Sequence, residues 1–179
     1  MKLFKVYLII FAVVIGVIII SRFFPHKYFV ERSIVIDKPI EQTFGYMSNL
    51  KNWEQWSLWN KSIDSTLYYF YNNKFDTLGA RQYLRGELLG RGVFEVDSFI
   101  HNQLLHFTLV VNDGDRTASG TFLFKSINPS STSLHWIDSG DVGNNPIKRF
   151  MIPFVTKNTE ATLDAGLASI KKCAESSKP

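Results

Sequence analysis

The hydrophobic positions of this chain follow three patterns in succession. Residues 6–20 form a continuous apolar run without a charge, and from residue 28 onward apolar and polar positions alternate. After residue 145 the spacing becomes helical, with one apolar face formed by Leu163, Leu167, Ile170 and Ala174. The pattern predicts an apolar N-terminal segment, a β-rich region and a long C-terminal helix.

The alternating region predicts an antiparallel sheet. Residues 29–36 read as a strand, and Pro39 then opens a helix to about residue 50, followed by a short helical stretch over 50–56. Turn-forming residues separate six further strand-like segments, at 65–72, 81–88, 92–100, 104–111, 117–127 and 131–138. Because the links between them are short, we expect an antiparallel meander rather than parallel βαβ units.

The C-terminal helix is predicted from Asn145 and Pro146 to about residue 172. Asn145 is a helix-capping residue type, and Pro146 suits the first helical position. Pro153 lacks the N–H that a helix interior needs, so we expect it to kink or interrupt the helix. The whole order is α+β: a curved antiparallel sheet of about seven strands, two short helices and one long helix.

The apolar run near the N-terminus predicts a single membrane-spanning helix over residues 3–21, which is close to the length that a bilayer requires. A cleaved signal peptide is the first alternative, but residues 18–22 show no A-x-A pattern of a cleavage site. A buried core helix is the second, but the run has no polar stripe. We therefore divide the chain into an anchor, 1–24, and a folded domain, 25–179.

The orientation of this anchor follows from few charges. Lys2 and Lys5 precede the apolar run, and Arg22, Lys27 and Arg32 follow it, so the positive-inside rule is nearly balanced. The N-terminal tail has only a few residues and is easily kept in the cytoplasm. We therefore expect the folded domain to lie outside the cytoplasm.

Composition and charge exclude several classes of protein. With 45% hydrophobic and 15% aromatic residues, the chain has ample apolar surface to offset the entropy of ordering. The net charge is +4, but Lys2, Lys5 and Arg22 supply three of these charges, which leaves +1 for residues 23–179. A nucleic-acid-binding domain carries its own basic patch, so we expect no nucleic-acid partner. The single cysteine, Cys173, excludes an intramolecular disulfide.

Short motifs occur along the folded domain at residues 32–36, 38–44, 52–57, 86–87, 90–92, 135–136, 140–146 and 166–171. In this order they resemble the SRPBCC superfamily, also called START-like, and within it the polyketide cyclase/dehydrase-like branch. The resemblance covers about residues 29–176. Leu84 departs from it, because members often carry a tryptophan there.

The resemblance implies a helix-grip fold, in which a curved sheet wraps around the long C-terminal helix. One helix cannot fill that concavity, so we expect an apolar cavity with its mouth near the short helices. The predicted ligand-binding residues are Trp56 and Trp59 at the mouth, Phe107, Leu109, Phe122 and Trp136 on the sheet, and Phe150 and Phe154 on the helix. Core packing is the alternative explanation for the tryptophans.

Other side chains offer little catalytic chemistry. His106 and His135 are out of phase with their apolar neighbours and should face solvent, and no histidine has zinc-ligand spacing. Asp113 and Asp115 read as a turn rather than a calcium site. Asp138 and Asp141 could form an acid–base pair, but a solvated loop explains them. We predict no metal and no cofactor.

The sequence therefore predicts a membrane-anchored protein that binds a hydrophobic small molecule or lipid. The first alternative is a cyclase- or hydratase-like enzyme acting on a polyketide-like substrate. The second is a structural or stress-associated membrane protein without a ligand. An enzyme needs an acid, a base or a Tyr/His pair facing the cavity, whereas the cavity residues assigned above do not titrate, which favours binding.

Overall fold

The computed structural model describes residues 2–114 and 116–177, so Asp115, expected in a turn, lies outside the described residues. The helices are α1 (Lys2–Ser21), α2 (Ile40–Ser48), α3 (Trp53–Trp56) and α4 (Pro146–Ser176), with the 3-10 turns η1 (Leu50–Asn52) and η2 (Asn112–Gly114). The strands are β1 (Lys27–Ile36), β2 (Tyr68–Tyr71), β3 (Arg81–Gly86), β4 (Gly90–Ile100), β5 (Leu104–Val111), β6 (Arg116–Asn128) and β7 (Ser131–Asp141).

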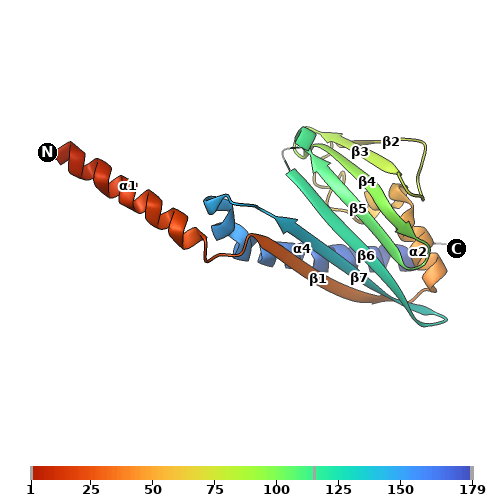
Figure 1. Ribbon diagram of the computed structural model, residues 1–179. Coiled ribbons are helices and arrows are strands. Elements are labelled where there is room, and N and C mark those ends of the chain that lie inside the picture. The colour runs from red at the N-terminus through yellow and green to blue at the C-terminus, as the bar shows by residue number, and fades with distance from the viewer. Residues whose placement is uncertain (1, 115, 178–179) are drawn as a thin grey trace.

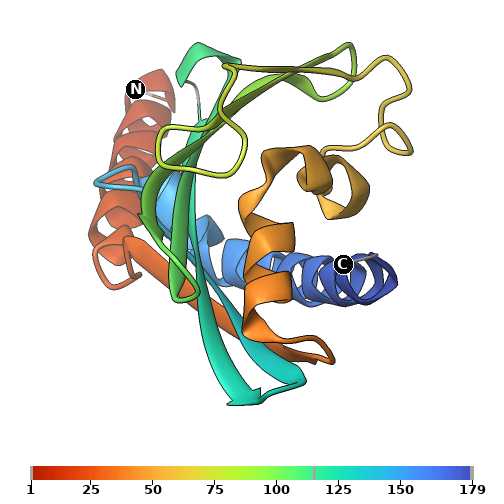
Figure 2. The same cartoon turned by 90° about the vertical axis from the view of Figure 1, so that its right-hand side faces the viewer.

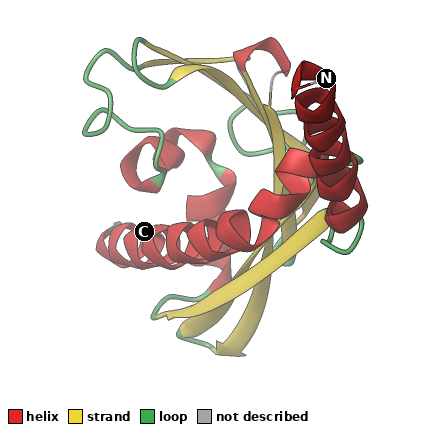
Figure 3. Ribbon diagram, turned by 90° about the vertical axis from the view of Figure 1, so that its left-hand side faces the viewer, coloured by secondary structure: helices red, strands yellow, loops and turns green. Residues whose placement is uncertain are grey.

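The strands form one seven-stranded antiparallel sheet with the order β1-β7-β6-β5-β4-β3-β2. Strands β2 to β7 follow one another as a meander, and β1 pairs with β7 at one edge. The sheet curves, and α2, α3 and α4 lie on its concave side (Figures 2 and 3). This is the expected α+β helix-grip fold. Helix α1 projects away from the sheet (Figure 1).

The core lies between the concave face and these helices. In β1 the even-numbered residues Val30 and Ile36 are buried while their neighbours are exposed, as the alternation predicts. Helix α4 buries one stripe against the sheet: Leu163, Gly166, Leu167, Ile170 and Ala174. The predicted apolar face of the C-terminal helix is thereby confirmed.

Pro153 does not interrupt α4, so the expected interruption was wrong, while the expected kink stays a prediction. The helix continues from Pro146 to Ser176, with the Asn145 side chain accepting a hydrogen bond from the Lys148 N–H. Pro153 is exposed, so its ring has room outside the helix, and a 31-residue helix keeps most of its hydrogen bonds when one donor is missing.

The predicted strand over residues 65–72 is shorter than expected, because a buried carboxylate organises the chain before it. Asp64 accepts hydrogen bonds from the Thr66 side chain and from the backbone N–H groups of Leu88 and Leu89. These bonds lower its pKa to about 2. A Cβ atom on Gly86 would lie 2.2 Å from this carboxylate, so the glycine permits the contact.

The approach of α4 to the sheet depends on a second glycine. A Cβ atom on Gly166 would lie 2.6 Å from Cζ3 of Trp136 in β7. On its other side, Nε1 of Trp136 would lie 3.1 Å from a Cβ atom on Gly120 in β6. The indole is therefore confined between two glycines and has little room to retreat.

We expect Gly166→Ala to destabilise the protein by about 1–3 kcal/mol, because the added methyl overpacks the contact with Trp136. Gly45→Ala in α2 is the matched control, since no atom lies within 4 Å of its added Cβ. That variant should gain about 0.5–1 kcal/mol from helix propensity. Thermal or denaturant unfolding measures both, and two equal gains would contradict the assigned contact.

Candidate functional site

A cavity of about 140 Å³ lies between the concave face of the sheet, α4 and the segment that begins at α3. Its position is the one that the helix-grip geometry predicts. The residues that line it are Trp56, Ser57, Leu58 and Trp59 beside α3, Phe94, Phe107, Leu109, Ala118, Trp136 and Asp138 on the sheet, and Thr162 and Gly166 on α4.

Aromatic rings make most of one wall. The rings of Trp56 and Trp136 meet edge to face with centroids 5.7 Å apart, and Phe122 lies behind them, 4.9 Å from Trp136 and 6.0 Å from Trp56. Phe107 stacks on Phe122 at 5.5 Å. Such contacts add to the stability that area burial supplies, and they make this wall closely packed.

Five of the eight sequence-predicted ligand residues line this cavity: Trp56, Trp59, Phe107, Leu109 and Trp136. Phe122 is fully buried behind the wall. Phe150 and Phe154 lie elsewhere, because Gly166 is sixteen and twelve residues further along α4, about 24 and 18 Å at 1.5 Å per residue. The Phe150 ring packs on Phe24 with centroids 4.6 Å apart, and Phe154 is 63% exposed.

Asp138 is the cavity residue that sequence reasoning placed wrongly. Sequence reasoning ended the strand at Asp138 beside a solvated loop, whereas β7 continues to Asp141, so Asp138 lies within the strand. It lines the cavity on the same face as Leu134 and Trp136. The alternation that turned Trp136 inward was the available signal, but the following Ser139 and Gly140 suggested that the strand had already ended.

The Asp138 carboxyl is the one acidic group in the cavity lining described. Burial raises its pKa above the usual range, and the hydrogen bond from the Tyr28 hydroxyl offsets part of that rise. Burial, together with the nearby Asp138 charge, also raises the pKa of Tyr28. The pair places an acid and a hydroxyl together at the edge of an otherwise apolar chamber.

Three of the four histidines pair with acids away from this cavity. His26 contacts Asp141 at 3.0 Å, His135 contacts Glu31 at 2.9 Å, and His106 bonds to Asp97. In the part of the chain that the structure describes, no three His, Cys, Asp or Glu side chains group as metal ligands would.

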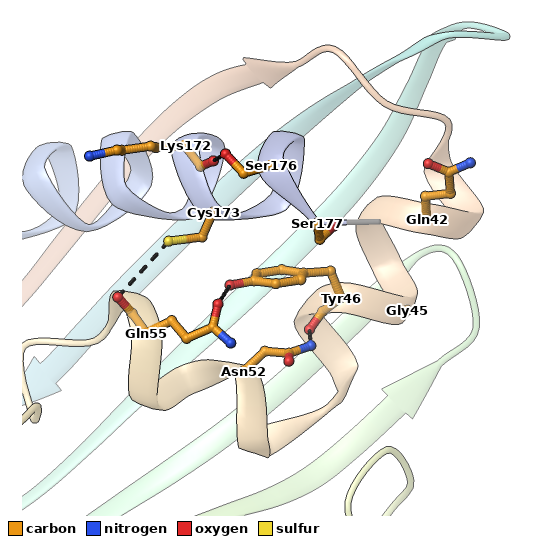
Figure 4. Close-up of a pocket in the computed structure, with 9 residues that line it drawn as sticks. All are labelled: Gln42, Gly45, Tyr46, Asn52, Gln55, Lys172, Cys173, Ser176 and Ser177. Atoms are coloured by element: carbon orange, nitrogen blue, oxygen red, sulfur yellow. Dashed lines mark hydrogen bonds between the residues drawn. The ribbon is translucent and has the colours of Figure 1, made fainter. Parts of the chain in front are cut away.

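A second pocket, of about 600 Å³, lies where α2, the η1–α3 segment and the end of α4 meet (Figure 4). Residues with polar side chains make up most of its lining. The Tyr46 hydroxyl donates to Gln55 Oε1 at 3.3 Å, Asn52 Nδ2 donates to the Tyr46 carbonyl at 2.8 Å, and Cys173 Sγ lies 3.9 Å from the Gln55 carbonyl (Figure 4). These contacts join α2, the η1–α3 segment and the end of α4 to one another.

Comparison with known proteins reveals the fold. No protein-family model matches the chain. No curated protein matches it by sequence. Solved structures do: a START superfamily protein from Mycobacterium smegmatis has 18% identity and a TM-score of 0.56, with 82% of this chain and 97% of that chain covered.

Two further structures give the same picture. The Zhui aromatase/cyclase from Streptomyces sp. R1128 has 11% identity and a TM-score of 0.58, covering 84% of this chain and 94% of that one. Protein MLL2253 from Mesorhizobium loti has 16% identity and a TM-score of 0.58, covering 86% and 99%. Likeness at these identities establishes the shared helix-grip fold and no shared activity.

We expect Asp138→Asn to stabilise the protein at pH 7–8. A carboxyl whose folded pKa is raised contributes its stability below the unfolded pKa of about 4, and that contribution is lost as the pH rises through the folded value. The amide never ionises, so the difference between variant and wild type should shrink toward pH 4. Thermal unfolding across this range tests it, and an equal loss at both ends would show that Asp138 acts only through Tyr28.

Proposed function

We propose that this protein is a membrane-anchored binder of a hydrophobic small molecule, which its domain, residues 25–179, holds between the sheet and α4. The cavity carries this proposal, because an apolar chamber with few polar groups suits an apolar ligand. A START superfamily protein and an aromatase/cyclase share this fold, which supports a ligand-binding or cyclase role.

The cavity volume restricts the ligand in this conformation. About 140 Å³ resembles the ~150 Å³ of an engineered cavity that binds benzene, and drug-sized ligands occupy roughly 300–1,000 Å³. The chamber as it stands therefore fits one ring. A lipid or isoprenoid chain requires α4 or the segment at Trp59 to move outward first.

The apolar surface around α1 supports the membrane part of the proposal. By length and composition, Phe4–Ser21 could cross a bilayer, and 6% of that window is buried. Where α1 ends, α4 presents a stripe of exposed apolar residues at helical spacing: Ile147, Met151 and Phe154. Phe24 joins the two helices through Phe150, and Phe23 beside it is 86% exposed. We propose that this stripe rests on the membrane surface, with the domain outside the cytoplasm.

One observation favours a second candidate function. Asp138 is a partly buried carboxyl in the cavity wall with a raised pKa, which is what a general acid requires. A cyclase- or hydratase-like enzyme would use it to protonate a bound carbonyl compound. The Tyr28 hydroxyl already interacts with this carboxyl, and the rest of the described lining offers no second acid or base. We therefore prefer a binding function to a catalytic one.

Ligand binding can be tested with iodobenzene, a ring-sized quencher of tryptophan emission, added to the full chain in lipid nanodiscs. Quenching should saturate, because Trp56, Trp59 and Trp136 line the cavity. Ala118→Phe should abolish the saturable part by filling the chamber. Ser119→Phe is the matched control, since neighbouring residues of a strand face opposite sides of the sheet. Saturable quenching that survives Ala118→Phe would place the probe outside this cavity.

The anchor is tested by a chain that begins at residue 23 and so keeps Phe24. We expect this chain to remain in solution without detergent and to unfold cooperatively. The full chain should instead stay in the membrane fraction after an alkaline wash, because its apolar helix is held by lipid. A full chain released by the wash, or a shortened chain that aggregates, would contradict the division at residue 24.

A further inference from the structure

Two polar atoms in the cavity wall have no hydrogen-bond partner. They are Nε1 of Trp56 and Nε1 of Trp136, and both are buried. Trp56 as a whole is only 4% exposed. The neighbouring Trp53 shows the usual arrangement, because its Nε1 donates to the Met47 carbonyl at 2.7 Å.

Unpaired indole donors in a core need an explanation. Folded proteins pair the large majority of their buried polar atoms, and an N–H removed from water without a partner is unfavourable. Among the described residues the only other buried side-chain atom of this kind is Asn102 Oδ1, in the turn between β4 and β5. Both unpaired indole donors therefore belong to residues that line the cavity.

The position of Trp136 tells which end of the cavity is polar. Its Nε1 edge lies against Gly120, which pairs with Asp138 across β6 and β7. Asp138 lines the cavity two residues further along the same face. The unpaired donor of Trp136 and the only acid in the described lining therefore lie at one end, while Leu109, Phe94 and Ala118 supply apolar wall.

We propose that the cavity selects a ring-sized apolar compound that carries one hydrogen-bond-accepting oxygen, and that this oxygen accepts from the unpaired indole N–H groups of Trp56 and Trp136. The proposal rests on the proposed binding function and adds the ligand's chemical class. Both nitrogens are covered in the present conformation. The side chains that cover these nitrogens must therefore move aside as the ligand enters, and the N–H groups then gain the partner that the protein does not provide.

Two probes of the same planar shape test this selectivity. Acetophenone carries a carbonyl oxygen where α-methylstyrene carries a CH₂ group. The full chain, labelled with ¹⁵N at tryptophan and held in lipid nanodiscs, is titrated with each probe, and binding is expressed against the free aqueous probe concentration. Acetophenone should bind about fivefold or more tightly, the gain expected of one net hydrogen bond. It should also shift the Nε1–H resonance of Trp56 or Trp136 downfield, which α-methylstyrene should not do.

Variants assign the effect to the indole donors. Trp56→Phe and Trp136→Phe keep an aromatic ring and remove the N–H, and each should reduce the preference for acetophenone. Trp59→Phe changes another tryptophan of the same cavity whose nitrogen is not a buried unpaired donor, and it should keep the preference. Should either of the first two variants fail to fold, the affinity ratio of the wild-type chain decides by itself.

The outcomes separate this inference from the function on which it rests. Equal affinities for the two probes, with saturation of both, would overturn the oxygen-acceptor inference and leave hydrophobic binding in place. If neither probe gives saturable binding, both the oxygen-acceptor inference and the proposed binding function are overturned. A preference that Trp59→Phe removes and Trp136→Phe keeps would also overturn the assignment to the unpaired donors.

Discussion

The packing of Trp136 between Gly120 and Gly166 sets the distance between α4 and the sheet. A β-carbon at Gly166 would lie 2.6 Å from the ring, so only glycine lets the helix come this close. With α4 held at this distance, aromatic side chains fill most of the space over the concave face. The cavity that remains is small, and the Trp136 indole, which sets the distance, forms part of its wall.

This constraint explains why the cavity and the core cannot be separated. Trp56 and Trp136 line the cavity, yet each also packs on Phe122 in the centre of the core. A ligand larger than one ring must displace side chains that stabilise the fold, and its own buried area must offset that cost, at roughly 25 cal/mol per Å². The protein can therefore favour compact ligands by packing alone.

Local patterns in the sequence were sufficient for most of the fold, because strand alternation and helical spacing are properties of neighbouring residues. They also predicted that Trp136 and Leu109 face inward. They failed to place residues whose position depends on the distance along an element or on a contact between distant parts of the chain. Phe150 and Phe154 share a helix with Gly166 but lie about 24 and 18 Å from it. Asp138 was placed at the last residue of its strand, beside a solvated loop, because residues after it suggested a turn that the pairing of β7 with β1 prevents.

The polar groups of the cavity divide into those that the protein satisfies and those that it leaves unpaired. The Asp138 carboxyl pairs with the Tyr28 hydroxyl, so this acid already has a structural role. The indole N–H groups of Trp56 and Trp136 have no hydrogen-bond partner, whereas the indole N–H of the nearby Trp53 donates to a backbone carbonyl. A site for purely apolar molecules would gain nothing from indole donors, and phenylalanine would fill the same wall without their desolvation. Under the proposed function, the tryptophans are therefore the residues through which this chamber would distinguish one ring-sized molecule from another.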